Sequence, residues 1–300
     1  MSSRPKRATL WIGPSGWSYE DWYGVVYPLR RPRGFKPLAY LAQFFNAVEV
    51  NSSFYRIPTA RMTAAWVPLV PREFRFAFKL TQIFTHQRDE FPAESDVQAY
   101  TEALRPIRAA GLLGPVLMQF PWSFRYTSDA VAWLERLAAA FPELERFIEV
   151  RHSSWAQEDA LAALRRVGGY CNIDQPRLRA CLGPSQHVFG PNAYVRLHGR
   201  NAQSWFADDV PSFERYNYLY SDEELREWVR RLEAMCAQAE NVYLFANNHY
   251  RGQGPVNALE LRALLEGGRV SVPDDLRNAY PRLAAIARAS GDAGLFDPIQ

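Results

Sequence analysis

Charged and amide side chains end a series of short apolar runs in this sequence of 300 residues. Two runs, Val48-Glu49-Val50-Asn51 and Ile148-Glu149-Val150-Arg151, show the same alternation. Residues two apart lie on one face of a β-strand, so each run has one polar and one apolar face. The polar faces are predicted to carry Glu49, Asn51, Lys79, Gln119, Glu149, Arg151, Asn172, Asp174, Arg196, His198 and Asn247, while Cys171 and Ile173 are predicted to face helices.

Carboxylates beside cations favour acid/base hydrolysis of a polar ligand. A neighbouring cation keeps one carboxylate ionised, while an apolar wall raises the pKa of another, which supplies both a base and an acid. We predict that Glu149 and Asp174 fill these roles, with Glu49 and His198 completing the catalytic group. The side chains expected to bind charge, hydroxyls or amides of the ligand are Lys79, Arg151, Arg196, Asn51, Gln119, Asn247 and Asn248.

Other chemistries stay open for the same residues. Lysine and arginine also bind anions without catalysis, so the ligand could be a nucleotide, a sugar phosphate or a nucleic-acid end. Lys79 could form a Schiff base if neighbouring cations lower its pKa. His198, His249 and the carboxylates could bind a divalent metal ion. The metal is less favoured, because no H-x-H or H-E-x-x-H string occurs and cations share the pocket, so the sequence predicts no cofactor and no metal ligands.

Eight apolar runs alternate with helical patterns, which predicts a (β/α)₈ barrel of the TIM type. An open doubly wound sheet is the alternative, but no G-x-G-x-x-G follows the first run. Expected strands span Leu10–Gly13, Ala47–Asn51, Phe74–Leu80, Val116–Phe120, Phe147–Arg151, Tyr170–Asp174, Ala193–His198 and Val242–Asn247. Expected helices span Pro37–Phe45, Ala60–Trp66, Asp96–Ala110, Ser128–Phe141, Ala156–Val167, Ser221–Ala239 and Val256–Glu266.

The chain is predicted to form one barrel domain over residues 10–267. Residues 1–9 are expected to be a disordered tail, and residues 268–300 an extension that is helical around Arg282–Arg288. Proline and glycine between Pro176 and Pro191 predict an irregular sixth crossover. Ser221 followed by Glu224 matches a capping box, and Ser128 is expected to cap the helix that begins there.

In such a barrel the inward strand ends form the floor of the active site. The alternative is a buried ionic layer that merely fills the barrel, but buried charges lower stability unless they are paired. Aromatic residues make up 14% of the chain, more than a core needs. Several fall in the loop after the first strand and in the loop from Gly199 to Tyr220, where they could bind a ligand or bury the loop itself. The stacking wall is expected to contain Trp17, Tyr19, Trp22 and Tyr55.

Composition limits the class of protein. The net charge is +3, and basic and acidic residues are interleaved, so charge does not indicate nucleic-acid binding. The three cysteines are far apart and form no C-x-x-C pair, which argues against disulfides. No run is long and apolar enough for a signal peptide or a membrane span, so we expect a cytoplasmic protein with a small polar or anionic ligand and no membrane partner.

Several strings together resemble one family. They include Gly13-Pro14-Ser15-Gly16-Trp17-Ser18-Tyr19, Val48-Glu49-Val50-Asn51-Ser52-Ser53-Phe54-Tyr55, Glu149-Val150-Arg151-His152-Ser153-Ser154-Trp155, Val195-Arg196-Leu197-His198-Gly199-Arg200 and Phe245-Ala246-Asn247-Asn248-His249. In this order they resemble the YecE-like family, the domain of unknown function seventy-two. The resemblance runs from about Leu10 to Leu265 and implies a TIM-type barrel, but it implies no particular reaction.

Overall fold

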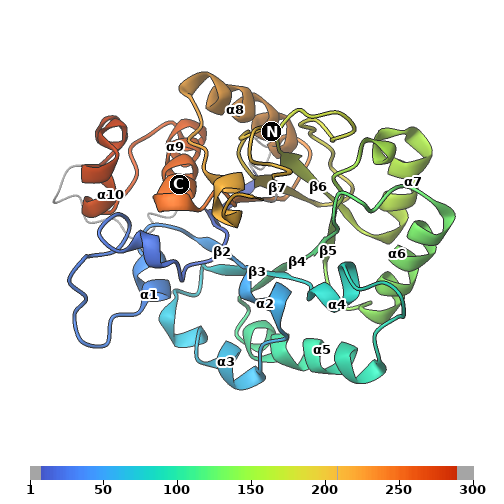
Figure 1. Cartoon of the computed structure of the whole chain (residues 1–300). Coiled ribbons are helices and arrows are strands. Elements are labelled where there is room, and N and C mark those ends of the chain that lie inside the picture. The colour runs from blue at the N-terminus through green and yellow to red at the C-terminus, as the bar shows by residue number, and fades with distance from the viewer. Residues whose placement is uncertain (1–7, 208, 289–300) are drawn as a thin grey trace, which may run out of the picture.

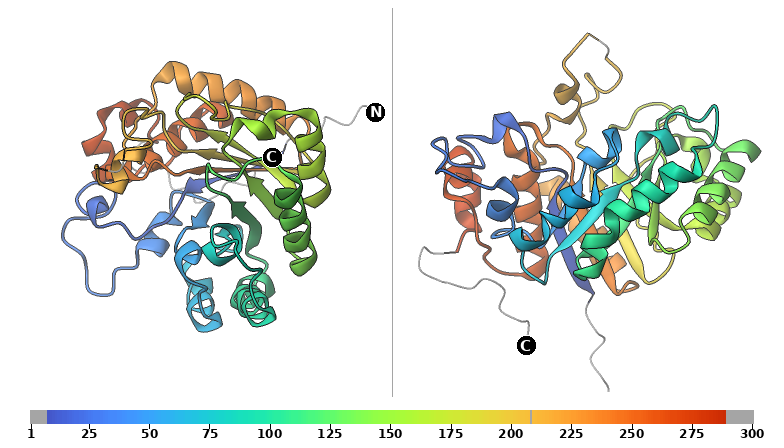
Figure 2. Two further views of the ribbon diagram at one scale, coloured as in Figure 1. Left: turned by 45° about the vertical axis from the view of Figure 1, so that its right-hand side comes forward. Right: turned by 90° about the horizontal axis from the view of Figure 1, so that it is seen from below.

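The computed structural model describes residues 8–207 and 209–288. Residues 1–7 of the expected tail and residues 289–300 of the expected extension lie outside the described residues. Eight parallel strands form a nearly closed barrel with helices around it, so the predicted (β/α)₈ fold is confirmed (Figure 1). In the right-hand view of Figure 2 the gold segment, around residues 199–220, extends from one end of the barrel.

The strands follow one another around the barrel in the order β1-β8-β7-β6-β5-β4-β3-β2. Helices cover their outer faces, and the inner faces meet inside the barrel, so both faces are buried and the strands read as apolar runs. The strands are β1 (Thr9–Pro14), β2 (Ala47–Val50), β3 (Arg75–Lys79), β4 (Leu113–Gln119), β5 (Arg146–Glu149), β6 (Gly169–Asp174), β7 (Asn192–Leu197) and β8 (Asn241–Ala246).

The barrel closes between β1 and β2 through a side chain. Asn46 Oδ1 accepts a hydrogen bond from the Ile12 amide at 2.8 Å, and its Nδ2 donates to the Leu10 carbonyl at 2.7 Å. A single bridge between Ser15 and Glu49 extends the contact at the carboxyl ends of both strands. Asn46 therefore supplies the hydrogen bonds that a full strand ladder would supply.

Gly13 makes this close approach sterically feasible. A Cβ atom at Gly13 would lie 1.8 Å from the carbonyl oxygen of Ala47, which is backbone and cannot move aside. A residue with a side chain would push β1 away from β2 and open the barrel.

Ten α-helices and several 3₁₀ turns occur in the described part of the chain. The two four-residue helices α2 and α4, which follow β2 and β3, were not predicted because they are too short to show a 3.6-residue period. The helices are α1 (Pro37–Leu41), α2 (Ser52–Tyr55), α3 (Ala60–Ala64), α4 (Gln82–Thr85), α5 (Glu94–Ala109), α6 (Ser128–Ala140), α7 (Glu158–Val167), α8 (Asp222–Cys236), α9 (Gln253–Glu266) and α10 (Asp274–Ala279). The 3₁₀ turns are η1 (Glu20–Trp22), η2 (Val67–Leu69), η3 (Ser153–Ala156), η4 (Ser212–Tyr216), η5 (Tyr250–Gly252) and η6 (Pro281–Ala285).

Two capping predictions have opposite outcomes. The Ser221 box is confirmed, since its hydroxyl accepts from the Glu224 amide and the Glu224 carboxylate accepts from the Ser221 amide. Ser128 is not the cap of α6. Thr127 precedes it, has extended backbone angles and accepts from the Ala130 amide, so the neighbouring hydroxyl takes the role.

The irregular sixth crossover is confirmed, because no helix occurs between β6 and β7. The extension differs in part from the prediction: α10 begins earlier than expected, and the expected helical region around Arg282–Arg288 contains all of the 3₁₀ turn η6 except Pro281 but no α-helix. Arg282 donates to Glu260 of α9 and pairs with Asp222 of α8, which fastens this part of the extension to the barrel. None of the helices in the described residues is long and apolar enough to cross a membrane.

Candidate functional site

Arg196 lies between two carboxylates at the carboxyl end of the barrel. Its Nη2 is 2.7 Å from Glu49 Oε1, and its Nη1 is 2.6 Å from Glu149 Oε2. None of the three side chains is exposed to solvent. Strands β2, β5 and β7 thus meet in one ionic cluster inside the barrel, as their alternation predicted.

Other donors occupy the remaining carboxylate oxygens. The Ser15 and Tyr194 hydroxyls donate to Glu49, Tyr194 over 2.7 Å. Arg151 donates to Glu149 from two nitrogens, at 2.8 and 3.0 Å. Neither Ser15 nor Tyr194 was predicted as a site residue, although Tyr194 lies two residues before Arg196 and shares its face by alternation.

Burial alone would raise the pKa of Glu49, but Arg196, Lys79 and the donated hydrogen bonds lower it overall. Glu149 follows the same pattern: burial opposes ionisation, and Arg196, His198 and Arg151 hold its pKa well below the ordinary value. Both groups are therefore ionised near neutral pH and act as anchors for the arginines. A carboxylate held this firmly is a poor proton acceptor.

His198 is neutral in this cluster. Burial lowers its pKa to about 4, although Glu149 acts in the opposite direction. Nε2 lies 3.1 Å from Glu149 Oε1, so it must carry the proton, because a carboxylate only accepts. Nδ1 then accepts from Asn247 Nδ2 at 3.0 Å. The two neighbours together fix one tautomer.

Lys79 ends β3 on the same inward face and is 6% exposed. Its Nζ lies 4.2 Å from the centre of the Phe54 ring. Among the described residues, no carboxylate lies within ion-pairing distance of this nitrogen. Burial lowers the pKa of Lys79 to about 7, Arg196 adds to the effect, and Glu49 and Glu149 oppose it. Lys79 is thus a group that can gain or lose a proton near neutral pH.

The predicted orientation of strand six is wrong. In the sheet, Cys171 lies beside Tyr194 and Ile173 beside Arg196, whereas Asp174 lies beside Leu197. Paired residues of neighbouring strands share a face, so Cys171 and Ile173 point into the barrel. The thiol of Cys171 lies 3.9 Å from Glu149 Oε2, which agrees with this.

Asp174 and Asn172 therefore face the helix layer. Asp174 accepts from Arg200 Nε at 2.8 Å, and Arg200 in turn donates to Glu224 of α8. Asn172 Oδ1 accepts from the His187 amide at 2.7 Å and fastens the irregular crossover. Both residues stabilise the outside of the barrel and do not join the cluster around Glu149.

The amide side chains that were predicted to bind the ligand lie at different places in the structure. Asn247 and Gln119 are almost fully buried on the inward face, where Asn247 contacts His198 and Gln119 donates to the Phe120 carbonyl. Asn248 is buried and donates to the Tyr218 carbonyl in the segment between β7 and α8. Asn51 interacts with the Tyr19 hydroxyl. Asn51 follows β2 and precedes α2, and Gln119 ends β4; these two strands flank β3, which ends at Lys79.

The predicted stacking wall is only partly present. Trp22 is fully buried and donates to the His249 carbonyl, so it belongs to the core. Trp17 packs edge-on against Trp66. Tyr19 stacks on His249 with ring centres 4.4 Å apart. Tyr55 alone of the four is strongly exposed, at 68%.

The segment from Gly199 to Tyr220 covers part of the cluster. Trp205 is buried, with its ring 5.5 Å from the Arg151 guanidinium and 6.1 Å from the His198 ring. Tyr216 also packs near His198, with ring centres 6.4 Å apart, and Phe206 contacts Trp122. The aromatics of this segment thus shield Arg151 and His198 from water. Trp205 and Tyr216 were not predicted as site residues.

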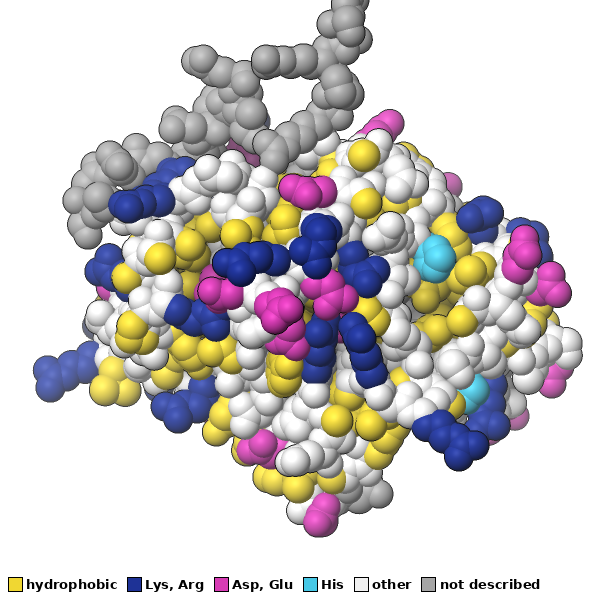
Figure 3. Space-filling view, turned by 90° about the horizontal axis from the view of Figure 1, so that it is seen from above, with side chains coloured by type: hydrophobic (Ala, Val, Ile, Leu, Met, Phe, Trp, Pro, Cys, Tyr) yellow, Lys and Arg dark blue, Asp and Glu magenta, His cyan; other side chains and the backbone are white. Residues whose placement is uncertain are grey.

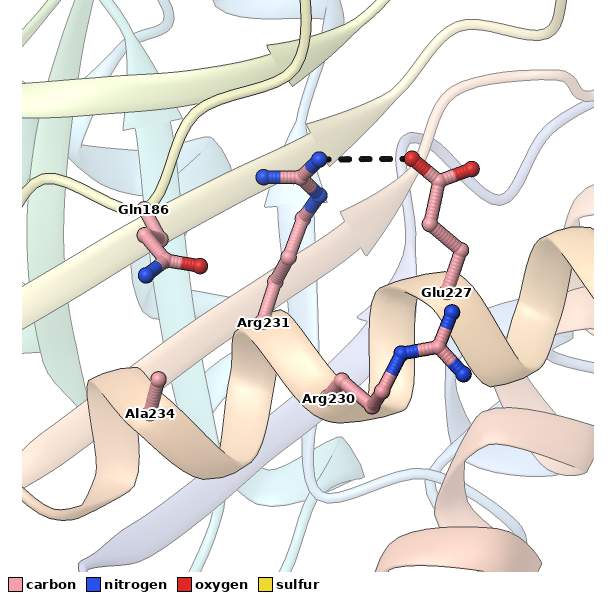
Figure 4. A pocket seen from close by; sticks show the side chains of 5 residues that line it. All are labelled: Gln186, Glu227, Arg230, Arg231 and Ala234. Atoms are coloured by element: carbon pink, nitrogen blue, oxygen red, sulfur yellow. Dashed lines mark hydrogen bonds and ion pairs between the residues drawn. The ribbon is translucent and has the colours of Figure 1, made fainter.

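A cavity of about 490 Å³ lies elsewhere, on the outside of the barrel between α8 and the irregular crossover. In Figure 4 Arg230 and Arg231 of α8 line it with Gln186, and Arg231 pairs with Glu227. Seen from above, this side of the molecule shows basic and acidic side chains interleaved (Figure 3). The cavity contains none of the predicted site residues, and its charges largely pair with one another.

Metal binding gains no support from the arrangement. No group of three or more His, Cys, Asp or Glu suited to hold a metal ion occurs in residues 8–207 or 209–288. His249 stacks on Tyr19 rather than joining Glu149 and His198 as a possible ligand. A divalent ion at Glu149 would have to displace the hydrogen bonds from Arg196, Arg151 and His198.

Comparisons with known proteins agree with the predicted resemblance. Residues 11–281 match the family described as "Protein of unknown function DUF72", a range that includes α10 and so extends beyond Leu265. The UPF0759 protein YunF of Bacillus subtilis (strain 168) is 30% identical over 271 residues, which cover 86% of this chain and 95% of YunF. The UPF0759 protein YecE of Escherichia coli (strain K12) is 26% identical over 145 residues, 48% of each chain.

Solved structures give the same result. The crystal structure of a DUF72 family protein from Thermotoga maritima MSB8 superposes with a TM-score of 0.76 at 32% identity, covering 86% of this chain and 99% of that one. A DUF72 family protein from Enterococcus faecalis V583 also gives 0.76, at 26% identity, covering 86% and 96%. The chain therefore belongs to the DUF72 family of proteins of unknown function.

Proposed function

We propose that the strand-end cluster binds a small anionic molecule, with Lys79 as its main cation. The main support for this proposal is that Lys79 has no carboxylate partner among the described residues. The carboxylates of Glu49 and Glu149 already accept hydrogen bonds from other donors. A ligand anion would supply the missing partner and raise the pKa of Lys79 again. Charge-assisted hydrogen bonds of this kind contribute about 1.5–3 kcal/mol each.

The charge balance supports the same conclusion. Glu49 and Glu149 carry two negative charges, and Arg151 and Arg196 carry two positive charges. Protonated Lys79 leaves one positive charge in excess in a buried site, which is costly without an anion. Arg151 retains its Nη1 for a ligand, since Glu149 engages its Nε and Nη2.

Carboxylate acid/base hydrolysis gains less support from this geometry. Asp174 faces the helices, and Glu149 is held ionised, so neither is placed to deliver a proton to a ligand at the cluster. Hydrolysis of the ligand, and the cytoplasmic location, stay predictions from the sequence. Lys79 is the better candidate for a proton acceptor, because its pKa lies near neutral.

Calorimetric titration with inorganic phosphate and with malonate tests the proposal. We expect Lys79→Met to lower the affinity at least tenfold, which corresponds to about 1.4 kcal/mol. Arg230→Met, which removes a cation from the α8 cavity, is the matched control and should leave the affinity unchanged. If the Arg230 variant lost binding and the Lys79 variant kept it, the anion site would lie on the outside of the barrel and the proposal would be wrong.

A further inference from the structure

We propose that Lys79 is a Schiff-base lysine, and that the anionic ligand of the strand-end cluster carries an aldehyde or ketone group. This inference rests on the proposed anion binding and specifies the chemistry of that ligand. It begins from three features of Lys79: its place on the inward face of β3, its burial, and the lack of a carboxylate partner among the described residues.

The choice of lysine at this position is the first argument. The chain contains 35 lysines and arginines, of which only Lys6, Lys36 and Lys79 are lysines. Every Lys or Arg that forms an ion pair in the described residues is an arginine, including the two that hold Glu49 and Glu149. Arginine suits fixed bidentate pairs, whereas lysine can lose its proton and act as a nucleophile. The unpaired cation of the cluster is thus the one with a usable amine.

The charge balance is the second argument. With Lys79 as a neutral amine, the charges of Glu49, Glu149, Arg151 and Arg196 sum to zero. The neutral amine is the form that attacks a carbonyl carbon. Once an imine forms and is protonated, its positive charge is balanced by the anionic group of the ligand. Substrate-free and substrate-bound sites are therefore both neutral overall.

The surroundings of the amine are the third argument. One side of Nζ faces the Phe54 ring, which Tyr55 and His86 support with edge-on contacts. The ring face itself attracts a cation, but burial outweighs this contact and lowers the pKa of Lys79 to about 7. Near neutral pH the amine fraction is then larger by about 10³ than for an ordinary lysine with a pKa near 10.4.

The covalent step needs only one proton from solvent. The Nζ lone pair forms a bond to the carbonyl carbon, and a proton moves from the nitrogen to the carbonyl oxygen to give a neutral carbinolamine. A solvent proton then adds to the hydroxyl, the C–O bond breaks and water leaves, which gives the protonated imine. The sum is amine plus carbonyl compound and one proton giving iminium and water.

Reductive trapping tests the inference on the full chain. The protein is incubated with glyoxylate or pyruvate and sodium cyanoborohydride at pH 7, and the modified lysine is identified by peptide mass spectrometry. Glycolate, which has no aldehyde or ketone, serves as the unreactive anion. Lys36 is exposed and provides an internal reference. We expect trapping at Lys79 to exceed trapping at Lys36 at least tenfold, and protein unfolded in urea to lose this preference.

Two variants separate this inference from the proposed anion binding. Lys79→Arg keeps the positive charge, so we expect it to retain glycolate and phosphate binding while trapping at position 79 disappears. Modification confined to Lys36 or the amino terminus in wild-type protein that still binds glycolate would overturn the Schiff base alone. If the folded wild-type protein bound neither glycolate nor phosphate, the proposed function would be overturned as well.

Discussion

Arg196 Nη1 lies 2.6 Å from Glu149 Oε2, with both side chains fully enclosed. Removal of one member of a buried pair leaves the other charge without a partner, which costs about 3–5 kcal/mol. We therefore expect Glu149→Gln to lower the free energy of unfolding by about that amount in urea titrations. The exposed pair of Arg166 and Glu135, 3.4 Å apart, is the matched reference. Glu135→Gln should change the same quantity by less than about 1 kcal/mol. Equal losses in the two variants would show that the cluster is solvated.

Lys79 should make stability depend on pH in the alkaline range. Burial lowers its pKa to about 7 in the folded chain, against about 10.4 when unfolded. Between these values the unfolded chain binds more protons, so stability rises with pH, and the effect is absent in Lys79→Met. Between pH 7 and pH 10 we expect the free energy of unfolding of the wild type to rise by about 3.5 kcal/mol relative to that of the variant. A difference that stays constant over this range would mean that Lys79 remains protonated.

The outward orientation of Asp174 can be checked through its separate effects on stability and binding. Asp174→Asn removes the charge that Arg200 holds over 2.8 Å, so we expect a loss of about 2–4 kcal/mol in unfolding free energy. Phosphate affinity should stay within about twofold, because the side chain lies outside the barrel. A tenfold loss of affinity with unchanged stability would restore the inward orientation expected from the sequence.

The case of strand six shows what the sequence leaves open. Both faces of a barrel strand are buried, so Cys171 with Ile173 and Asn172 with Asp174 are equally consistent with the alternation. We assigned the polar pair to the inside by analogy with β2, β5 and β7. The register beside Tyr194 and Arg196 decides otherwise, and such long-range pairing is not encoded in local alternation.

Elsewhere the local pattern was sufficient. Glu49, Lys79, Glu149, Arg196 and His198 lie on the inward face as predicted, because the residue directly before each of them is apolar, buried and on the opposite face. Aromatic residues in loops were harder to place. Trp22 and Trp205 both lie in segments between strands and helices, and only the folded chain shows that each is buried. A tryptophan in a long loop serves a core and a ligand wall equally well.

The neutral tautomer of His198 is open to a spectroscopic test. Burial lowers its pKa to about 4, so at pH 7 we expect nitrogen NMR shifts of a neutral ring with the proton on Nε2. Asn247→Asp places a carboxylate beside Nδ1, which favours the protonated ring and should raise the pKa by about 1–3 units. Titration of wild-type His198 near pH 6.5 would contradict the buried arrangement.

Closure of the barrel between β1 and β2 depends on the absence of a side chain at Gly13. At Gly13 a methyl group would meet the Ala47 carbonyl at 1.8 Å, and neither strand can retreat without loss of the Asn46 hydrogen bonds to Ile12 and Leu10. We expect Gly13→Ala to lower the free energy of unfolding by about 3 kcal/mol or more, as overpacking against backbone does. Gly183→Ala is the matched control, since nothing lies within 4 Å of its added methyl group. Because β1 and β2 also bring Ser15 to Glu49, the Gly13 variant should lose anion affinity together with stability, whereas the Gly183 variant should keep both.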